Sequence, residues 1–176
     1  MEFMGLHLPG ASFVNPDSPL REALTVQAVH QAAAITALGA DYRPAGVVLD
    51  ERAFVNGLVG LMATGGSTNL VLHLPAMARA AGILLDLADF DEISAVVPLM
   101  AKVYPNGLAD VNHFHAAGGL QFLIGQLLDA GLLHGDAKTV AGTALQHYRQ
   151  EPKLTEGHLG WVPGPTTSLN DKILRP

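Results

Sequence analysis

The run Ala63–Asn69 (Ala-Thr-Gly-Gly-Ser-Thr-Asn) contains the residue types of an anion-binding turn. The paired glycines Gly65 and Gly66 permit a sharp turn and let the backbone approach a ligand closely. Ser67, Thr68 or Asn69 can cap a following helix, whose free N–H groups would favour a carboxylate or a phosphate. The alternative is an ordinary joint between two helices with a polar cap, and the residue types alone favour this alternative.

His73 lies one helical turn after Asn69 and is expected to share its face of the predicted helix. It could add a polar side chain to an anion site. A single histidine in such a position is more often a packed, hydrogen-bonded side chain than a catalyst.

The segment Asp110–His115 offers a second polar arrangement, with the pattern of a weak metal site. If the segment is extended, His113 and His115 lie on one side of the chain, and Asp110 could add an oxygen ligand. The alternative is a polar loop whose histidines hydrogen-bond to backbone groups before the next helix begins at Gly118–Gly119. Three ligands without known geometry favour the loop.

The remaining motifs carry little chemistry. The acidic residues from Asp86 to Glu92 lack the glycine and spacing of a calcium loop and are typical of a helix start. The sequence contains no nucleophile elbow, no phosphate-binding loop with Gly-Lys-Ser/Thr and no His-Glu-x-x-His. These residues predict an α/β segment with two glycine-rich polar turns, and they do not identify a reaction.

Helices must position these turns, because the apolar residues recur mainly at helical spacing. Ser18 followed by Pro19 predicts a helix start, and Gly39 predicts its end. Pro75 predicts a bend or an early break in the helix after the glycine turn.

The predicted helices cover residues 20–38, 51–63, 69–81, 118–128 and 139–148. The predicted β-like runs cover 47–49, 83–87 and 96–103, the last two with a helix or an irregular run as alternative. We expect residues 151–176, rich in proline and glycine, to be mostly irregular.

The composition excludes several classes of protein. Apolar residues make up 49% of the 176 residues and charged residues only 15%, so the chain has little polar surface with which to cover itself. No apolar run is long enough to span a membrane, and no signal peptide opens the sequence. The net charge of −6 argues against nucleic acid. We therefore expect a cytoplasmic protein whose apolar faces meet further protein, in the same chain or in a second subunit.

Several separated stretches resemble the dihydroxy-acid and 6-phosphogluconate dehydratase family. The first is Ala63–Asn69, continued by Leu72-His73-Leu74 and Ala76–Gly82. Other stretches are similar to the 6-phosphogluconate branch: Met4–Ala11, Val97-Pro98, Val103–Gly107, Asp110–Phe114, Ala116–Gly119, Leu132–His134 and Leu174–Pro176. The resemblance extends nearly from end to end, with the motifs in the family's order.

The resemblance implies a hydro-lyase that dehydrates 6-phosphogluconate to 2-keto-3-deoxy-6-phosphogluconate in the Entner–Doudoroff pathway. It implies an iron–sulfur cluster, expected to be 4Fe–4S, and a magnesium ion in the full-length enzyme, which is expected to be a homodimer. The resemblance implies that the cluster acts as a Lewis acid on the departing hydroxyl, that a base removes the proton next to the carboxylate, and that magnesium assists. By position, Gly65, Gly66, Ser67, Thr68, Asn69 and His73 match the active-site-lining stretch, with contact to the substrate carboxylate or phosphate expected.

The chain departs from the family in having no cysteine. The resemblance places the cluster cysteines upstream of Met1–Gly5 and a β-barrel domain after Pro176. We therefore assign residues 1–150 to the N-terminal, cluster-binding domain without its cysteine segment, and 151–176 to a tail leading to the barrel. We expect this chain alone to bind no cluster or metal, to have no catalytic residue of its own and to be inactive. The alternatives are a dihydroxy-acid dehydratase, a non-catalytic interaction module derived from the enzyme, and a metal-binding protein using Asp110, His113 and His115.

Overall fold

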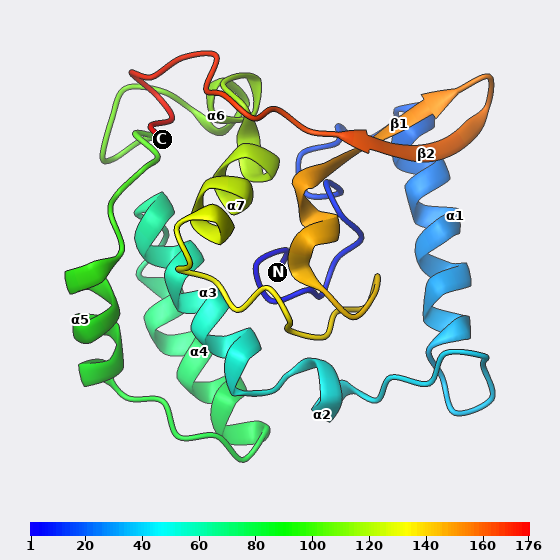
Figure 1. Cartoon of the computed structure of the whole chain (residues 1–176), viewed down its shortest axis with the longest axis horizontal. Helices are drawn as coiled ribbons and strands as arrows, with labels where there is room; N and C mark the ends of the chain where they lie inside the picture. Colours follow the sequence, from blue (N-terminus) through cyan, green and yellow to red (C-terminus); the bar gives the residue numbers. More distant parts are fainter.

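The computed structural model describes all residues, 1–176, and has a helix-rich α/β architecture, as the sequence predicts (Figure 1). The helices are α1 (Pro19–Ala34), α2 (Ala45–Val48), α3 (Glu51–Thr64), α4 (Asn69–Ala80), α5 (Leu87–Val96), α6 (Val111–Ala116) and α7 (Gly119–Asp129). A 3-10 turn, η1 (Leu145–Arg149), leads into strands β1 (Gln150–Thr155) and β2 (His158–Pro163), which pair antiparallel as a hairpin. No helix has both the length and the apolar character needed to cross a membrane.

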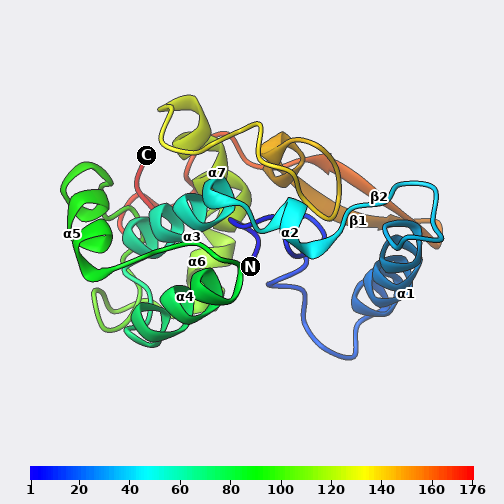
Figure 2. The same cartoon turned by 90° about the horizontal axis from the view of Figure 1, so that it is seen from below.

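Helix α3 is the central element, because it contributes to both hydrophobic clusters of the protein. It begins at the predicted cap, where the Asp50 carboxylate accepts a hydrogen bond from the Ala53 N–H at 3.0 Å. Phe54 and Leu58 pack with residues of α4 and α5 in one cluster, and Val59 packs with residues of α6 and α7 in the other. Figures 1 and 2 show α3 among these helices. Two apolar faces on one helix therefore hold the helical part together.

The N-terminal loop, residues 1–10, is largely buried in the middle of the molecule (Figure 1). Its buried polar groups need partners, since an unpaired group would cost free energy. The Glu2 carboxylate accepts hydrogen bonds from the N–H groups of Gly10, at 3.0 Å, and Ser12, at 2.8 Å. The Tyr148 hydroxyl donates to the His7 carbonyl at 2.6 Å, and the Trp161 indole donates to the Pro9 carbonyl at 2.9 Å. Elements from both ends of the sequence thereby hold the loop.

Helix α1 lies at the opposite side of the molecule from α5, next to the β1–β2 hairpin (Figures 1 and 2). Ser18 caps it and Pro19 is its first residue, as predicted. Leu24 is its only buried residue. Long polar side chains connect it to the body: Arg21 donates to the carbonyls of Ala11 and Val14, and Gln31 donates to the carbonyl of Val140. Most of its apolar surface is uncovered.

The predicted end of this helix at Gly39 is wrong, because α1 ends at Ala34. Beyond that point the chain folds back, and the N–H of Asp41 donates to the Ala34 carbonyl at 3.0 Å. The N–H of Arg43 likewise donates to the Ile35 carbonyl at 3.0 Å. These contacts occupy carbonyls that a continuing helix would have used. The predicted β-like run at 47–49 is also wrong: Pro44 precedes a single helical turn, α2.

The sequence interpretation is least accurate near the C-terminal end. Residues 139–148 form no continuous helix, so this prediction is wrong. The Thr139 N–H and hydroxyl both donate to the Gly142 carbonyl, which turns the chain. The only helical structure in this stretch is the 3-10 turn η1. Residues 151–163, expected to be irregular, belong to the hairpin, whose turn has positive φ at Glu156 and Gly157. Within the tail 151–176, irregular structure is thus confined to 164–176. The domain boundary after residue 150 stays a prediction.

Two further expectations are settled by the fold. Pro75 neither ends nor interrupts α4, which continues to Ala80. Residues 83–86 form no strand and lead into α5. Residues 96–103 form no continuous strand either. Within them, Ala101 makes an isolated bridge to Leu174, and Val103 makes one to Ala109. The helices predicted at 51–63, 69–81 and 118–128 are confirmed within one or two residues.

Candidate functional site

The glycine turn connects the end of α3 to the start of α4. Gly65 ends α3 in the left-handed conformation, with φ of 57°, and its N–H donates to the carbonyls of Leu61 and Met62. Residues with a side chain adopt this conformation at a cost, so a glycine is favoured here. Thr68 is the N-cap of α4, although its side chain makes no capping hydrogen bond.

Two backbone donors remain free in this turn. The N–H groups of Ser67 and Thr68 donate to no acceptor within the chain, whereas the Gly66 N–H donates to the Leu61 carbonyl at 3.0 Å. The Ser67 hydroxyl accepts a hydrogen bond from the Asn69 N–H at 3.2 Å. Two adjacent free N–H groups at the start of a twelve-residue helix provide the electrostatics that favour an anion.

The turn forms part of the wall of a cavity of about 900 Å³. The other walls include the N-terminal loop and the Ser12–Phe13 segment, Val103–Asn106, Val111 and Phe114 of α6, and residues of α3, α4 and α7. No lysine, arginine or histidine lines it, and Glu2 is the only charged side chain in the wall. Because the Glu2 carboxylate already accepts two backbone hydrogen bonds, the wall consists mainly of apolar surface and of uncharged polar side chains, with no cationic side chain.

The structure separates the predicted site residues into two groups. Gly65, Gly66, Ser67 and Thr68 lie in the cavity wall. Asn69 and His73 do not line it, and both are exposed on α4. Any anion held by the free N–H groups would therefore contact the turn and not these two side chains.

The possible metal site at Asp110, His113 and His115 is not assembled. The segment is helical, where the sequence interpretation required it to be extended, so residues two apart point to different sides. Asp110 caps α6: its carboxylate accepts from the N–H groups of Asn112 and His113, and the His113 ring accepts from the Asp110 N–H. The hydrogen bond from the His113 N–H lowers the pKa of Asp110.

His115 is occupied elsewhere, stacked on the Phe13 ring with centroids 5.5 Å apart. No three histidine, aspartate or glutamate side chains in the chain lie close enough together to hold a metal ion. The acidic run is a helix start, as predicted, because Asp86 and Asp89 form the capping box of α5.

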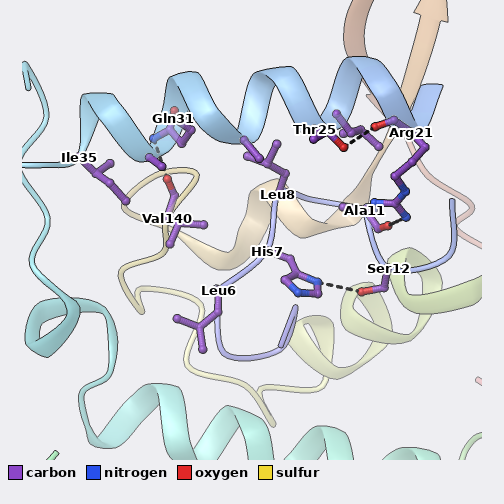
Figure 3. A pocket seen from close by; sticks show the side chains of 13 residues that line it. Leu6, His7, Leu8, Ala11, Ser12, Arg21, Thr25, Gln31, Ile35 and Val140 are labelled. Carbon is purple, nitrogen blue, oxygen red and sulfur yellow. Dashed lines mark hydrogen bonds between the residues drawn. The ribbon is translucent and has the colours of Figure 1, made fainter. Parts of the chain in front are cut away.

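A second cavity, of about 410 Å³, lies between α1 and the N-terminal loop (Figure 3). Its lining is mostly apolar, and its polar groups are already engaged. The His7 ring is hydrogen-bonded to the Ser12 hydroxyl at 3.2 Å, and Figure 3 shows Arg21 and Gln31 reaching their backbone acceptors. Burial lowers the pKa of His7, and the charge of Arg21 adds to this effect. The sequence interpretation missed this cavity because its walls come from distant segments without a shared motif.

Comparison with known proteins connects the glycine turn to an enzyme family. The family described as dihydroxy-acid/6-phosphogluconate dehydratase N-terminal matches residues 1–148. The chain is 61% identical, over 99% of its length, to a phosphogluconate dehydratase of Rhizobium meliloti, and 57% identical to one of Pseudomonas aeruginosa over its whole length. It is 39% identical over 83% of its length to a dihydroxy-acid dehydratase of Synechococcus. The chain spans 29% of the length of the first two relatives and 26% of the third.

Proposed function

The chain belongs to the dihydroxy-acid/6-phosphogluconate dehydratase family, and on that premise we propose that it forms part of the active-site scaffold of a hydro-lyase. In this proposal the substrate is 6-phosphogluconate and the product 2-keto-3-deoxy-6-phosphogluconate, the reaction belongs to the Entner–Doudoroff pathway, and the enzyme acts in the cytoplasm. Relatives named phosphogluconate dehydratase are 47–61% identical to the chain, against 39% for the dihydroxy-acid dehydratase, and this difference favours the phosphorylated substrate.

The observation that carries the proposal is the pair of free N–H groups at Ser67 and Thr68, in the wall of a large cavity. In this proposal the turn binds the substrate carboxylate or phosphate. The carboxylate is the better fit, since two N–H donors suit a single negative charge and the wall has no lysine, arginine or histidine side chain for a phosphate dianion. When the proton next to the carboxylate leaves, negative charge spreads onto the carboxylate oxygens. Fixed N–H donors would stabilise that charge.

The residues present do not fit the cluster and the magnesium ion that the family implies. An iron–sulfur cluster needs thiolates, and the chain has no cysteine. Magnesium prefers free carboxylate oxygens, and the only carboxylate in the cavity wall already accepts two hydrogen bonds. We propose that other parts of the full-length enzyme hold both groups.

Uncovered apolar surface supports the proposed association with those other parts, or with a second subunit in a homodimer. Val26 and Val29 on α1, and Leu72, Leu84 and Leu87 around α4 and α5, are each more than half exposed. So much exposed apolar surface is typical of a protein interface. The non-catalytic interaction module would use the same surfaces, but it would require no anion at the glycine turn.

The test is a calorimetric titration of the folded chain with 6-phosphogluconate, with and without magnesium. Thr68→Pro removes one free N–H without losing an internal hydrogen bond, and the Thr68 φ of −56° is one that proline adopts. We expect it to weaken binding roughly tenfold, the effect of one charge-assisted hydrogen bond. Thr68→Ala, the matched control, keeps the N–H and should bind like wild type. Equal affinities of the proline variant and wild type would contradict the proposal, as would a wild-type chain that folds and binds nothing.

A further inference from the structure

A segment forty residues along the chain covers the end of α3 and the glycine turn. The N–H groups of Met100 and Ala101 both donate to the Ala63 carbonyl, at 2.8 and 3.0 Å. Further along the same segment, the Asn106 side-chain amide donates to the Gly65 carbonyl at 3.1 Å. The carbonyls that a helix leaves unpaired at its C-terminal end thus receive donors from Met100–Asn106.

Asn106 contacts the turn closely as well as bonding to it. A Cβ atom added to Gly65 would lie 2.2 Å from the Asn106 side-chain nitrogen, so the amide occupies the space next to this glycine. Asn106 is itself held, because the Tyr104 N–H donates to the Ala109 carbonyl at 2.8 Å and closes the loop that carries it. Both Asn106 and the glycine turn line the 900 Å³ cavity.

The hydrogen bond has a defined consequence for the backbone. The Gly65 carbonyl and the Gly66 N–H belong to one planar peptide group. Leu61 holds the N–H end of this group, and Asn106 is the only donor to its carbonyl end. Two consecutive glycines have wide conformational freedom, so fixing both ends of their shared peptide restricts the direction in which the chain continues to Ser67 and Thr68.

We propose that Asn106 is a positioning residue, which fixes the Gly65–Gly66 peptide so that the Ser67 and Thr68 N–H groups are presented to an anion in the cavity. The inference rests on the proposed function, because that function supplies the anion that the Ser67 and Thr68 N–H groups would bind. The contact between Asn106 and the turn is independent of any ligand. Asn106 itself touches no substrate in this role.

The first experiment needs no ligand. Residue-resolved amide hydrogen exchange by NMR is measured at the Gly66 N–H in the wild-type chain and in Asn106→Ala. We expect exchange to be about fivefold faster in the variant, corresponding to the loss of one hydrogen bond that restrains the peptide. Asn112→Ala is the matched control, because Asn112 is also exposed but its side chain makes no hydrogen bond and lies outside the cavity wall. Unchanged exchange at Gly66 in Asn106→Ala would overturn the inference.

The second experiment measures 6-phosphogluconate binding by calorimetry, with Asn106→Asp as a further variant. At pH 7.5 the carboxylate cannot donate to the Gly65 carbonyl and repels an anion, so Asn106→Asp should bind more weakly than Asn106→Ala. Near pH 4 about half of the aspartic acid side chains are protonated and can donate again, so the difference in affinity between Asn106→Asp and Asn106→Ala should narrow. Ionisation of the ligand changes the affinity of both variants in the same way, so comparing the two variants at one pH removes this effect.

The two failures are distinguishable. If the wild-type chain does not bind 6-phosphogluconate, the proposed function of this segment fails, and the exchange experiment alone decides the role of Asn106. If the wild-type chain binds and Asn106→Ala binds within twofold of it, the positioning role is wrong although the proposed function survives.

Discussion

The side-chain amide of Asn56 pairs with the backbone of His134, which is 78 residues later in the chain. Its nitrogen donates to the His134 carbonyl at 3.2 Å, and its oxygen accepts from the His134 N–H at 2.8 Å. Asn56 is fully buried in α3, on the helix that carries the glycine turn. The pair therefore joins α3 to the turn that follows α7.

Replacing Asn56 by leucine, of similar volume, should destabilise the protein by about 2–4 kcal/mol, because two hydrogen bonds are lost and two backbone groups are left without partners. The measurement is the free energy of unfolding from urea denaturation. Asn112→Leu, on an exposed helix position, should change it by less than about 0.5 kcal/mol. If Asn56→Leu lowers the free energy of unfolding no more than Asn112→Leu does, water must replace the two hydrogen bonds to His134.

Replacing Gly60 by alanine tests the packing of the N-terminal loop against α3. A Cβ at this position would lie 2.4 Å from the Phe3 ring, so the ring must move. The better helix propensity of alanine offsets at most about 1 kcal/mol, and we expect net destabilisation of about 1–3 kcal/mol by urea denaturation. Gly46→Ala in α2 meets no atom within 4 Å and should be neutral or stabilising. Equal effects of the two substitutions would show that the loop does not pack here.

Replacing Glu2 by glutamine tests how the same loop is closed. The two carboxylate oxygens accept the N–H groups of Gly10 and Ser12, and an amide can offer only one acceptor oxygen. Its NH₂ group would then face a backbone N–H in a buried position. We expect a loss of about 1–3 kcal/mol in unfolding free energy, whereas Glu22→Gln on the exposed part of α1 should have little effect. A stability unchanged by Glu2→Gln would contradict the arrangement of the loop.

Tyr148 should make the protein sensitive to alkaline pH. Burial raises the pKa of its hydroxyl above the value of about 10 found in an unfolded chain. Its contribution to stability is therefore complete below pH 10 and is lost as the pH rises through the folded-state pKa, because only the unfolded state ionises readily. The difference in melting temperature between wild type and Tyr148→Phe should shrink or reverse between pH 9 and 11. A difference that stays constant over this range would contradict the burial of the hydroxyl.

Local features of the sequence predicted where several helices begin. Ser18, Asp50 and Asp86 each cap a helix through a hydrogen bond to a backbone N–H two or three residues ahead, so the signal and its effect lie in the same short segment. The glycine turn between two helices was predictable for the same reason. The order of the motifs also sufficed to indicate the family.

Contacts that follow no local spacing rule decided the rest. The end of α1 at Ala34 depends on Asp41 and Arg43 folding back, and the β1–β2 hairpin depends on a turn in which Glu156 takes a conformation unusual for glutamate. The partners of Glu2, Asn56 and Asn106 likewise lie 8 to 78 residues away, without a spacing rule that could reveal them. The sequence by itself determined several helix starts, the glycine turn and the family. Only the tertiary structure decided that Ser67 and Thr68 border a cavity while Asn69 and His73 do not, because a cavity wall is assembled from segments that meet only in the folded chain.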